Sequence, residues 1–482
     1  MQKSEVSKIW EGEERVQVKY DRWTEKVEKI KQKFEREVKP KKKNVSKQVR
    51  LMSKMRSNLK KERNQEQDKD KREKLHQDIT KLKEEIWKEE KQTKVRKIKK
   101  VVQEIRCFGG KLNGGAFWKL KKKITKKKCD SPHAVYNKSG EKVEEPNEIK
   151  KAYREFYEDL LKERPPITEE EKEKEKEINT VFEKIMEVAE TQKPIQVTDE
   201  EVKPILSHLK KKKAKDKEGW RNEMLIEGGD EMVKSIRMMA NQILDSEEHP
   251  SQWTNMIINS IHKKKDIKDL KNKRGLFLTN ILSKAFEKIV ESRTSLEFDK
   301  GQCGGKKHRG PIDNWFLLIA LRDTFKHLKK HTYLFFADLV KCFDKLWLKD
   351  CIVDIWKAGI REREAKTLYL LNKKAKIWIK TPVGMTESIE VNEVVKQGTV
   401  FAVKLCCSTT GEVNHIGPRP ITVINPKINT GAVIFVDDIM GGGNSGPVRG
   451  VMTNCVKMET QKKMEFSTEK SNWMVMKTGK RN

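Results

Sequence analysis

Two stretches decide the fold: FADLVKCFD (Phe336–Asp344) and, about a hundred residues later, AVIFVDD (Ala432–Asp438). Each predicts a short apolar strand that carries aspartate at its end, Asp338 on the first and the pair Asp437 and Asp438 on the second. Unpaired carboxylates on half-buried strands are costly unless they meet and hold divalent cations. Two such cations about 4 Å apart form the clamp that polymerases use for phosphoryl transfer. The three aspartates are therefore predicted to form one magnesium site.

The acidic pair is distinguished by its surroundings, because adjacent acids are common in a chain that is 37% charged. Glu84 and Glu85, for example, form such a pair in a long charged stretch, where a solvated surface is the simplest interpretation. Before Asp437 and Asp438, in contrast, stand the four apolar residues Val433–Val436, and the glycine-rich IMGGG follows. This pattern predicts a strand–turn–strand hairpin that carries the acids at its tip.

The net charge of the chain limits the class of its partners. The 482 residues include 106 Lys and Arg against 73 Asp and Glu, a formal net charge of +33, and only 35% are hydrophobic. A surface of this sign favours nucleic acid, and basic runs such as residues 39–43 and 97–100 favour non-specific phosphate contact. The longest apolar runs, at residues 316–321 and 333–340, are too short to span a bilayer. The start MQKSEVSKIW lacks the pattern of a signal peptide.

Cysteine and histidine residues give no clear metal motif. The eight cysteines include no C-x-x-C pair, which predicts reduced thiols in an intracellular protein of the nucleus or cytoplasm. His327 and His331 have the four-residue spacing of zinc ligands on a helix, but FKHLKKH offers no third ligand. A solvated basic helix is the preferred interpretation of that segment.

Residues 1–105 are predicted to form a basic helical or coiled-coil extension, because they are dense in charge and almost free of glycine and proline. The 4-3-4 spacing of a heptad seam is followed by Leu75, Ile79, Leu82 and Ile86. Two interpretations stay open. One is a long exposed helix or helical hairpin within one chain, and the other is a coiled coil that joins two copies into a homodimer.

Two further regions are expected after this extension. Residues 106–195 are predicted to be linker and helical lead-in, since the glycines of CFGGKLNGGAF (residues 107–117) end the helical pattern. An amphipathic helix is predicted in EIKKAYREFYEDLL, with an apolar face of Tyr153, Phe156, Tyr157 and Leu160. In residues 196–482 helices alternate with short strands, which predicts the α+β domain that carries the chemistry.

Further candidate substrate residues lie on both sides of FADLVKCFD. Gln397-Gly398 follows an apolar run and precedes a predicted helix, so the glycine permits a turn that brings backbone and glutamine amide towards a substrate. Lys263 and Arg274 lie in and beside a basic loop and have the charge to grip a triphosphate, the arginine in bidentate fashion. Each signal is weak alone, because most Gln-Gly pairs are ordinary turns and lysines are frequent in the whole chain.

The order of these segments is more specific than any one of them. After the basic loop, the chain has in succession GQCGGKKHRG, FADLVKCFD, VVKQGTVF, FVDD and MEFSTEKSNWMVM. This series resembles the successive motifs of reverse transcriptases, and it is most similar to those of non-LTR (LINE-type) retrotransposons. Lead-in pieces of that family are resembled by FWKLKKKI, KSGEKVEEPNEI, AYREFYEDLL, KKKAKDKEGWRNEML and HPSQWTNMIINSIHKKKDIKDLKNKRG. The resemblance covers roughly residues 107–477.

The resemblance implies a fold, an activity and a set of site residues. The implied fold is the fingers and palm of a right-hand polymerase around a central antiparallel sheet, preceded by the long basic helical extension. The implied activity is RNA-directed DNA synthesis on an RNA template, from a DNA primer and deoxynucleoside triphosphates. Asp338, Asp437 and Asp438 match the catalytic triad that binds two Mg²⁺ ions. Positions that match nucleotide-binding residues are Lys263 and Arg274 for the triphosphate, Phe343 for the sugar, Gln397 and Gly398 along the nucleotide, and Lys470 near the leaving phosphate.

The chain departs from the family pattern at several positions. Gly304-Gly305 stands where the family has Gly-Phe, RGLFL replaces a sequence with Ile-Ser-Leu, Cys342 replaces alanine, and Ala402-Val403 replaces Gly-Pro. The sequence shows no endonuclease domain, thumb or zinc knuckle, so a fragment is expected. Two alternatives stay open: a catalytically inactive remnant that only binds RNA or DNA, and an RNA-dependent RNA polymerase. Phe343 argues against the second, since RNA synthesis needs room for the 2′-hydroxyl.

Overall fold

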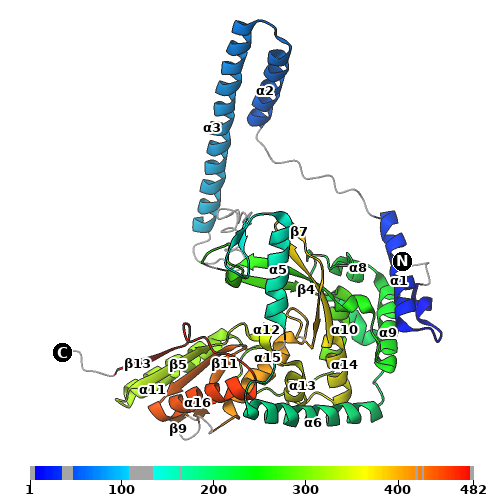
Figure 1. The fold of residues 1–482 in the computed structure, drawn as a ribbon, viewed down its shortest axis with the longest axis vertical. Coiled ribbons are helices and arrows are strands. Elements are labelled where there is room, and N and C mark those ends of the chain that lie inside the picture. Colours follow the sequence, from blue (N-terminus) through cyan, green and yellow to red (C-terminus); the bar gives the residue numbers. More distant parts are fainter. Residues whose placement is uncertain are drawn as a thin grey trace. The chain divides into compact units, whose positions relative to one another are not determined.

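The structure, a computed structural model, describes residues 6–34, 47–107, 134–162, 164–263, 265–393, 395–417, 422–425 and 428–477. The chain divides into two compact units, which we call the main unit (Met1–Phe34 with Ser131–Asn482) and the helical unit (Glu35–Asp130) (Figure 1). The extension expected over residues 1–105 is therefore shared between the two units. The glycine-rich segment expected to end the extension lies, after Cys107, outside the described residues, as does FWKLKKKI.

The described part of the helical unit is a pair of helices, α2 (Lys47–Gln65) and α3 (Lys69–Cys107), that pack against each other. Ile79 and Ile86 of the predicted seam are buried, so the seam of α3 packs against α2 of the same chain. Since α2 has 19 residues and α3 has 39, α2 faces only part of α3. Trp87 stays exposed on α3. The structure thus has the intrachain helical pair, and a homodimer through α3 stays a prediction.

The aspartate strands belong to a four-stranded sheet of the main unit. Across this sheet the strands follow the order β11 (Val433–Phe435), β12 (Asp438–Gly443), β5 (Thr332–Asp338) and β13 (Asn472–Met476). All three pairings are antiparallel. We call this sheet the aspartate sheet.

Two helices cover opposite faces of the aspartate sheet, α11 (Pro311–His327) and α16 (Ser445–Gln461) (Figure 1). Leu321 of α11 lies 3.0 Å from the position that a Cβ would take at Gly442. Val451 of α16 lies 2.9 Å from the corresponding position at Gly441. Successive residues of a strand point to opposite faces, so the glycines after the acidic pair allow both helices to approach β12.

A second sheet of the main unit has five strands of mixed direction. They are β4 (Lys273–Leu278), β3 (Asn255–His262), β6 (Lys374–Thr381) and β7 (Gly384–Met385) in order, with β8 (Ile389–Asn392) also paired to β6. Only β3 and β6 are parallel. Helix α5 (Pro146–Leu161) packs here: Tyr153 and Tyr157 are buried with this sheet's apolar residues, and Phe156 and Leu160 pack against them partly buried. The apolar face predicted for this helix is confirmed.

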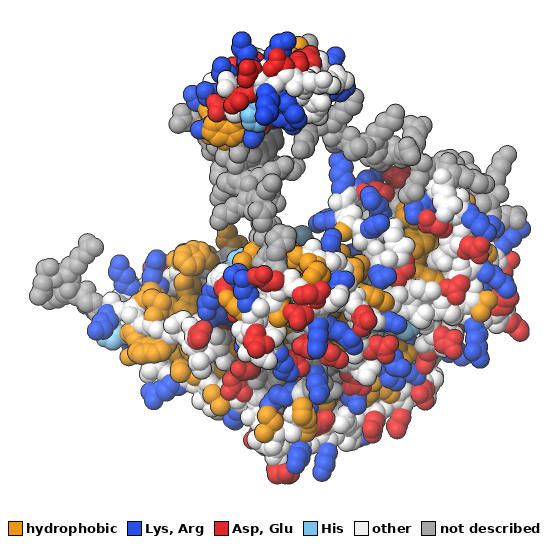
Figure 2. Space-filling model, turned by 45° about the horizontal axis from the view of Figure 1, so that its top comes forward, with side chains coloured by type: hydrophobic (Ala, Val, Ile, Leu, Met, Phe, Trp, Pro, Cys, Tyr) orange, Lys and Arg blue, Asp and Glu red, His pale blue; other side chains and the backbone are white. Residues whose placement is uncertain are grey.

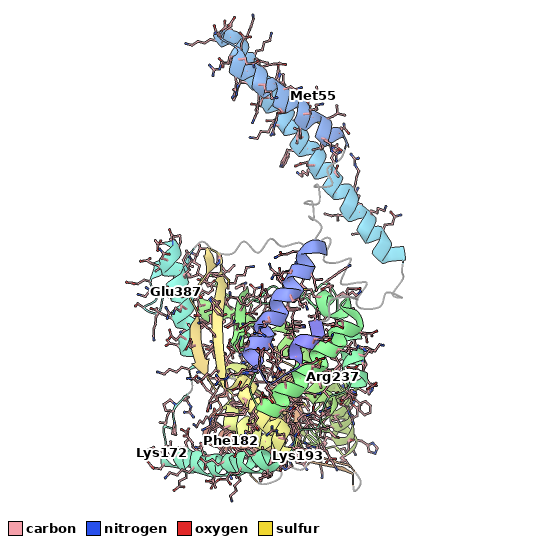
Figure 3. All side chains as sticks on the ribbon, turned by 90° about the vertical axis from the view of Figure 1, so that its right-hand side faces the viewer. Met55, Lys172, Phe182, Lys193, Arg237 and Glu387 are labelled. Atoms are coloured by element: carbon pink, nitrogen blue, oxygen red, sulfur yellow. The ribbon has the colours of Figure 1, made fainter. Side chains whose placement is uncertain are left out.

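Most other helices of the main unit share one large apolar core. They are α1 (Val16–Phe34), α6 (Glu169–Thr191), α7 (Asp199–Ser207), α9 (Gly229–Ser246), α10 (Ile281–Ser292), α13 (Leu348–Lys357), α14 (Glu362–Asn372) and α15 (Ala402–Gly411). Although α1 was expected in a separate extension, its Trp23 is buried and stacks on Trp220 with ring centroids 5.2 Å apart. Phe182 of α6, labelled in Figure 3, contacts Tyr369 of α14 edge-on at 4.7 Å.

Short elements complete the described part of the main unit: η1 (Val6–Trp10), β1 (Val135–Tyr136), β2 (Lys142–Val143), α8 (Asn222–Ile226), η2 (Ser251–Thr254), η3 (Leu270–Asn272), α12 (Cys342–Lys345), η4 (Glu412–Asn414), β9 (Thr422–Asn425) and β10 (Ile428–Thr430). The unit combines helices with sheets that are largely antiparallel, in agreement with the predicted α+β class. Its finer division into fingers and palm stays a prediction.

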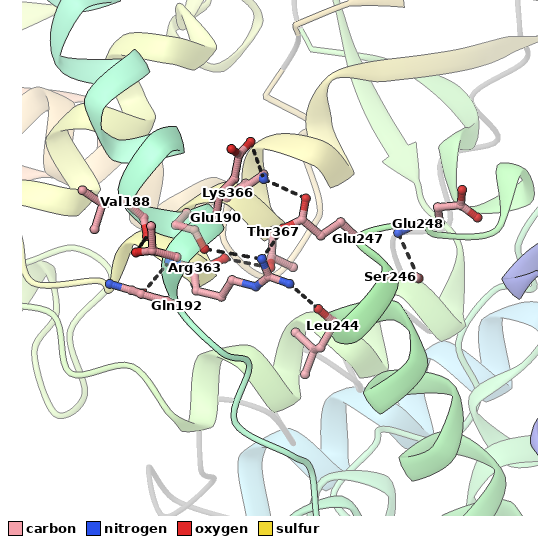
Figure 4. Close-up of polar contacts among 12 residues, drawn as sticks. Val188, Glu190, Gln192, Leu244, Ser246, Glu247, Glu248, Arg363, Lys366 and Thr367 are labelled. Atoms are coloured by element: carbon pink, nitrogen blue, oxygen red, sulfur yellow. Dashed lines mark hydrogen bonds and ion pairs between the residues drawn. The ribbon is translucent and has the colours of Figure 1, made fainter. Parts of the chain in front are cut away.

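A buried arginine ties three helices of the main unit together. Arg363 of α14 donates to the carbonyl of Leu244 on α9 at 2.7 Å and pairs with Glu247 at the end of α9 (Figure 4). It also lies 3.4 Å from the carbonyl of Ala189 on α6. Lys366, one turn along α14, pairs with Glu247 at 2.7 Å. Because removal of one partner would leave a buried charge, this network fixes how α6, α9 and α14 pack.

The two units differ in charge. Residues 35–130 contain 34 Lys and Arg against 14 Asp and Glu, so the helical unit contributes most of the net charge of +33. On the face shown in Figure 2, basic side chains are mixed with acidic ones over the coloured part of the surface.

Among the residues with a described structure, no helix has both the length and the apolar character to cross a membrane.

Candidate active site

The register of the aspartate sheet brings two of the three aspartates face to face. Asp338, the last residue of β5, is paired with Asp438, the first residue of β12. Cβ atoms of directly opposite residues lie about 4.5–5.5 Å apart. Asp437 precedes Asp438 in the turn that connects β11 to β12. Asp338 and the pair Asp437 and Asp438, far apart in sequence, therefore lie at one end of the sheet.

The turn between β11 and β12 has an unusual backbone. Val436 has a φ of 63°, in the left-handed region that costs a residue other than glycine on the order of 1–3 kcal/mol. The apolar strand expected over Val433–Val436 consequently ends at Phe435, because Val436 enters the turn. Such a conformation persists only where the surrounding structure enforces it.

Burial and mutual repulsion raise the affinity of the turn carboxylates for protons. Burial raises the pKa of Asp437, and the nearby charge of Asp338 raises it further. The pKa of Asp438 is likewise raised by burial and then by Asp437 and Asp338. Arg274 and Lys263 act in the opposite direction on the pKa of Asp437. Carboxylates that oppose each other's ionisation in this way are stabilised by a cation.

Lys470 already supplies one positive charge at this end of the sheet. It forms an ion pair with Asp338, in which both side chains are partly exposed. Within the described ranges, no three His, Cys, Asp or Glu side chains are close enough together to hold a metal ion. In kind, however, the donors fit a hard divalent cation, since three carboxylates supply oxygen ligands only. A cation bound there would compete with Lys470 for Asp338.

The candidate triphosphate residues lie on the five-stranded sheet. Strands β3 and β4 are paired, Lys263 directly follows β3, and Arg274 lies within β4. The N–H of Lys263 donates to the carbonyl of Asn272 at 3.0 Å, which holds the two ends of the basic loop together. Both cations are exposed, and both lower the pKa of Asp437. The structure therefore brings them within electrostatic reach of the aspartates.

Phe343 lies in α12, on the segment that follows Asp338. The ring is partly buried against the large core of the main unit. Its neighbour Cys342 is buried, with its Sγ 3.4 Å from the Sγ of Cys406 on α15. The six cysteines whose side chains are described, from Cys303 to Cys455, are free and buried. Phe343 thus has an anchored backbone and a ring that is partly open to solvent.

The turn predicted at Gln397-Gly398 is present and leads into α15. Gly398 has a φ of 95°, and a Cβ at this position would lie 2.8 Å from the carbonyl oxygen of Phe277 on β4, so a side chain is excluded. Beyond the turn, the N–H of Val400 donates to Glu287 of α10 at 2.7 Å. Burial raises the pKa of Glu287 to about 7. Glu287 thus anchors the chain between the turn and α15.

Sequence reasoning missed three residues that hold these segments in place: Glu287, Gln302 and Thr410. Glu287 and Thr410 gave no signal, because single charged or polar residues are ordinary on helices. Gln302 stands in GQCGGKKHRG, where glycines on both sides indicate close backbone contact. That signal marks the segment, but it does not show which strand the segment contacts.

The chain is similar to one family of known proteins and, weakly, to a solved structure. No curated protein matches the sequence. A solved structure of apo telomerase from Candida Tropicalis, truncated from its C-terminal domain, is similar at 15% identity with a TM-score of 0.34. The match covers 48% of this chain and 52% of that chain, so this chain spans about half of its length. Residues 261–480 match the family described as "Reverse transcriptase (RNA-dependent DNA polymerase)". These residues include every candidate site residue, and they form a reverse transcriptase domain.

Proposed function

We propose that this chain is an RNA-directed DNA polymerase of the non-LTR (LINE) type that uses two divalent cations. One observation carries the proposal: Asp338 is paired with Asp438 across β5 and β12, with Asp437 in the adjoining turn, inside a reverse transcriptase domain. The order of the motifs along the chain supports the LINE type. The substrates are deoxynucleoside triphosphates, a DNA primer and an RNA template.

Each candidate residue has a part in nucleotide transfer. When bound by the three aspartates, two Mg²⁺ ions would lower the pKa of the primer 3′-hydroxyl and stabilise the charge on the transferred phosphate. Lys263 and Arg274 bind the triphosphate, the arginine with two parallel hydrogen bonds. Phe343 packs under the sugar and leaves no room for a 2′-hydroxyl.

The remaining residues of the site orient the nucleotide and the leaving group. Gln397 and the backbone at Gly398 line the nucleotide. Lys470, which pairs with Asp338 in the structure, would lie close to the leaving phosphate. Most of the catalysis is positioning and electrostatic stabilisation, as phosphoryl transfer requires little covalent work from the protein.

The helical unit contributes to template binding through its charge. Residues 91–106 contain seven Lys and Arg and one acidic residue, so two copies of this part of α3 repel each other in parallel register. This repulsion makes nucleic acid a better partner for that surface than a second copy of the chain.

A second candidate function is a remnant that only binds RNA or DNA. Two observations favour it: Asp338 is paired with Lys470, and no three ligands in the described part of the chain are arranged for a metal ion. Nucleic-acid binding needs only the distributed charge. The third possibility, RNA synthesis, is disfavoured by the aromatic ring at Phe343.

Primer extension on an RNA template separates these functions. The chain is incubated with a DNA primer, deoxynucleotides and Mg²⁺, and Asp438→Asn is the matched inactive control. We expect extension that requires Mg²⁺ and is abolished in the variant. No extension by the parent chain, with template binding intact, would identify the binding-only remnant. Preference for ribonucleotides would instead identify an RNA polymerase.

A further inference from the structure

One buried side chain holds the turn that carries Asp437. Gln302 has no exposed surface, and its Oε1 accepts from the N–H of Val436 at 3.0 Å and from that of Gly304 at 2.8 Å. Its Nε2 lies 3.3 Å from the carbonyl oxygen of Val436 and donates to Oγ1 of Thr410 at 3.0 Å. A single amide therefore contacts both backbone groups of the residue with the left-handed conformation.

Thr410 of α15 supports the same peptide group from a second direction. Its Oγ1 lies 2.7 Å from the carbonyl oxygen of Val436 and 2.8 Å from that of Cys406. The hydroxyl has one proton, so it donates to one of these carbonyls at a time while it accepts from Gln302. The side chain is fully buried, and water cannot take its place.

The segment of residues 301–304 packs closely against β11. The N–H of Cys303 donates to the carbonyl of Ile434, and the N–H of Ile434 donates to the carbonyl of Gly301, both at 2.8 Å. A Cβ at Gly304 would lie 2.6 Å from the backbone nitrogen of Val436, so only glycine allows this approach. Residues 301–304 thus lie beside the hairpin, joined to β11 by an isolated parallel bridge between Gln302 and Ile434.

The other end of β11 is held in a similar way. The N–H of Ala432 donates to Oδ1 of Asn414 at 2.7 Å, and Nδ2 of Asn414 donates to the carbonyl of Ala432 at 3.0 Å. Side-chain amides thus bind the backbone at Ala432, before the strand, and at Val436, after it. The hairpin cannot slide or twist without breaking several buried hydrogen bonds, which are costly to leave unmade.

We propose that Gln302 and Thr410 are positioning residues for the reaction: they keep Val436 in its left-handed conformation and thereby set the direction of the Asp437 carboxylate. Without them Val436 would relax towards the extended conformation that β-branched residues prefer, and would turn the Asp437 peptide away from Asp338 and Asp438. The effect of these residues on DNA synthesis rests on the proposed function. Their stabilisation of the turn at Val436 does not.

Three substitutions test the proposal. Gln302→Met keeps the length of the side chain and removes its hydrogen bonds. Thr410→Val keeps the shape and removes the hydroxyl. Thr409→Val is the matched control, since Thr409 lies next along α15, is equally buried, and places its hydroxyl 3.4 Å from Sγ of Cys351 rather than on the turn.

Two readouts do not depend on activity. Hydrogen exchange measured by mass spectrometry on peptides that contain residues 433–438 should be faster in Gln302→Met than in the parent, because the N–H of Val436 loses its acceptor. Mn²⁺ titration followed by electron paramagnetic resonance should show an affinity lower by about 10-fold, the size typical for residues that orient metal ligands. Thr410→Val should change both in the same direction, Thr410→Ser should recover most of the decrease, and Thr409→Val should match the parent.

Kinetics provide a third readout. The kcat for nucleotide incorporation should fall in Gln302→Met, while KM for the deoxynucleotide stays within about twofold, because Lys263 and Arg274 are untouched.

Addition of Val436→Gly to Gln302→Met should restore part of the Mn²⁺ affinity, since glycine adopts a positive φ without strain. A general packing role for Gln302 would not be relieved by this second change.

The possible outcomes separate the two proposals. Parent-like exchange and Mn²⁺ affinity in both Gln302→Met and Thr410→Val would overturn the positioning role. If the parent itself neither binds Mn²⁺ nor extends primers, the proposed function fails, and the exchange of residues 433–438 alone decides whether the two residues hold the turn. If Gln302→Met does not fold, Thr410→Val against Thr409→Val gives the decision.

Discussion

The helical unit and the main unit use charge in different ways. In the helical unit 34 basic and 14 acidic residues are spread along a sequence whose described helices bury few side chains. In the main unit the decisive charges have fixed neighbours: Asp338 lies opposite Asp438, Arg363 pairs with Glu247, and Lys462 lies beside two buried aspartates. Binding of a polyanion depends on the number of charges, whereas chemistry depends on their register. Substitutions should therefore affect the two units differently.

The largest effect is expected for Asp437→Asn. Removal of one carboxylate from the cation site should lower the rate of single-nucleotide incorporation by on the order of 10³-fold, since a metal contributes several kcal/mol to stabilisation of the transition state. RNA affinity should change by less than about twofold, because one charge in a chain of +33 matters little. Incorporation and filter binding are measured on one preparation. A parallel decrease in RNA affinity would show that the two functions are not separate.

A stability effect of similar size is expected for Lys462→Met. Lys462, the residue directly after α16, lies 2.9 Å from Asp350 and 2.7 Å from Asp354 of α13, and all three are buried. Removal of the cation leaves two buried carboxylates, which should lower the free energy of unfolding by about 3–5 kcal/mol. Exposed Lys457 within α16 is the control, and Lys457→Met should change the free energy of unfolding by less than about 0.5 kcal/mol. Equal stability of the two variants would contradict this role.

The stability of Lys462→Met should also depend on pH more strongly than that of the parent. Burial, with the charge of Asp354, raises the pKa of Asp350 to about 7, so the folded chain binds this proton more tightly than the unfolded chain. Stability from this group is therefore present at acid pH and declines as pH rises from about 4 to 7. Lys462 lowers the pKa of Asp350, so its removal should extend the decline to higher pH. Thermal unfolding of the variant at pH 5 and pH 8 should differ more than that of the parent.

An intermediate effect is expected for Phe343→Ala. Removal of the ring should reduce discrimination against ribonucleotides by about 10- to 100-fold, the range for a changed steric contact in a substrate pocket. Deoxynucleotide incorporation should change little, because the aspartates are not altered. Competition between the two nucleotide types in one reaction gives the ratio directly. Unchanged discrimination would show that the sugar is sensed elsewhere.

The smallest effect is expected from the helical unit. In one variant Lys91, Arg96, Lys99 and Lys100 are changed to Gln. Its RNA affinity should depend less steeply on salt concentration. The slope of log affinity against log salt should decrease by about 0.7–0.9 for each phosphate that these side chains neutralise in the parent. Incorporation at saturating template should not change. The control variant replaces four exposed lysines of the acidic helix α6 and its end, Lys172, Lys176, Lys184 and Lys193. Equal slopes in the two variants would show that total charge matters and its location does not.

The sequence predicted strands and acids but not what holds them. The β5 and β12 strands were predictable because an apolar run before an acid is a local signal. The turn at Val436, by contrast, depends on Gln302, which is 134 residues away. No local pattern reports such an interaction, since the hydrogen bonds of a buried amide are set by tertiary packing.

The placement of α1 was also missed, for a different reason. Its residues were grouped with the charged extension by composition, yet Tyr20 and Trp23 of α1, like Trp10 of the preceding η1, are buried in the main unit. Aromatic residues spaced through a charged segment are a sign of an amphipathic helix with one buried face. The average composition of residues 1–105 does not indicate this helix, whereas the spacing of the aromatic residues does.

The central claim is that aspartates on two strands far apart in sequence form one cation site. Mn²⁺ titration by electron paramagnetic resonance, on the parent, Asp338→Asn and Asp438→Asn, tests it most directly. We predict that the parent binds Mn²⁺ and that each substitution weakens binding of the same ions, because Asp338 and Asp438 are paired across β5 and β12. Undiminished Mn²⁺ binding in Asp338→Asn would contradict a shared site.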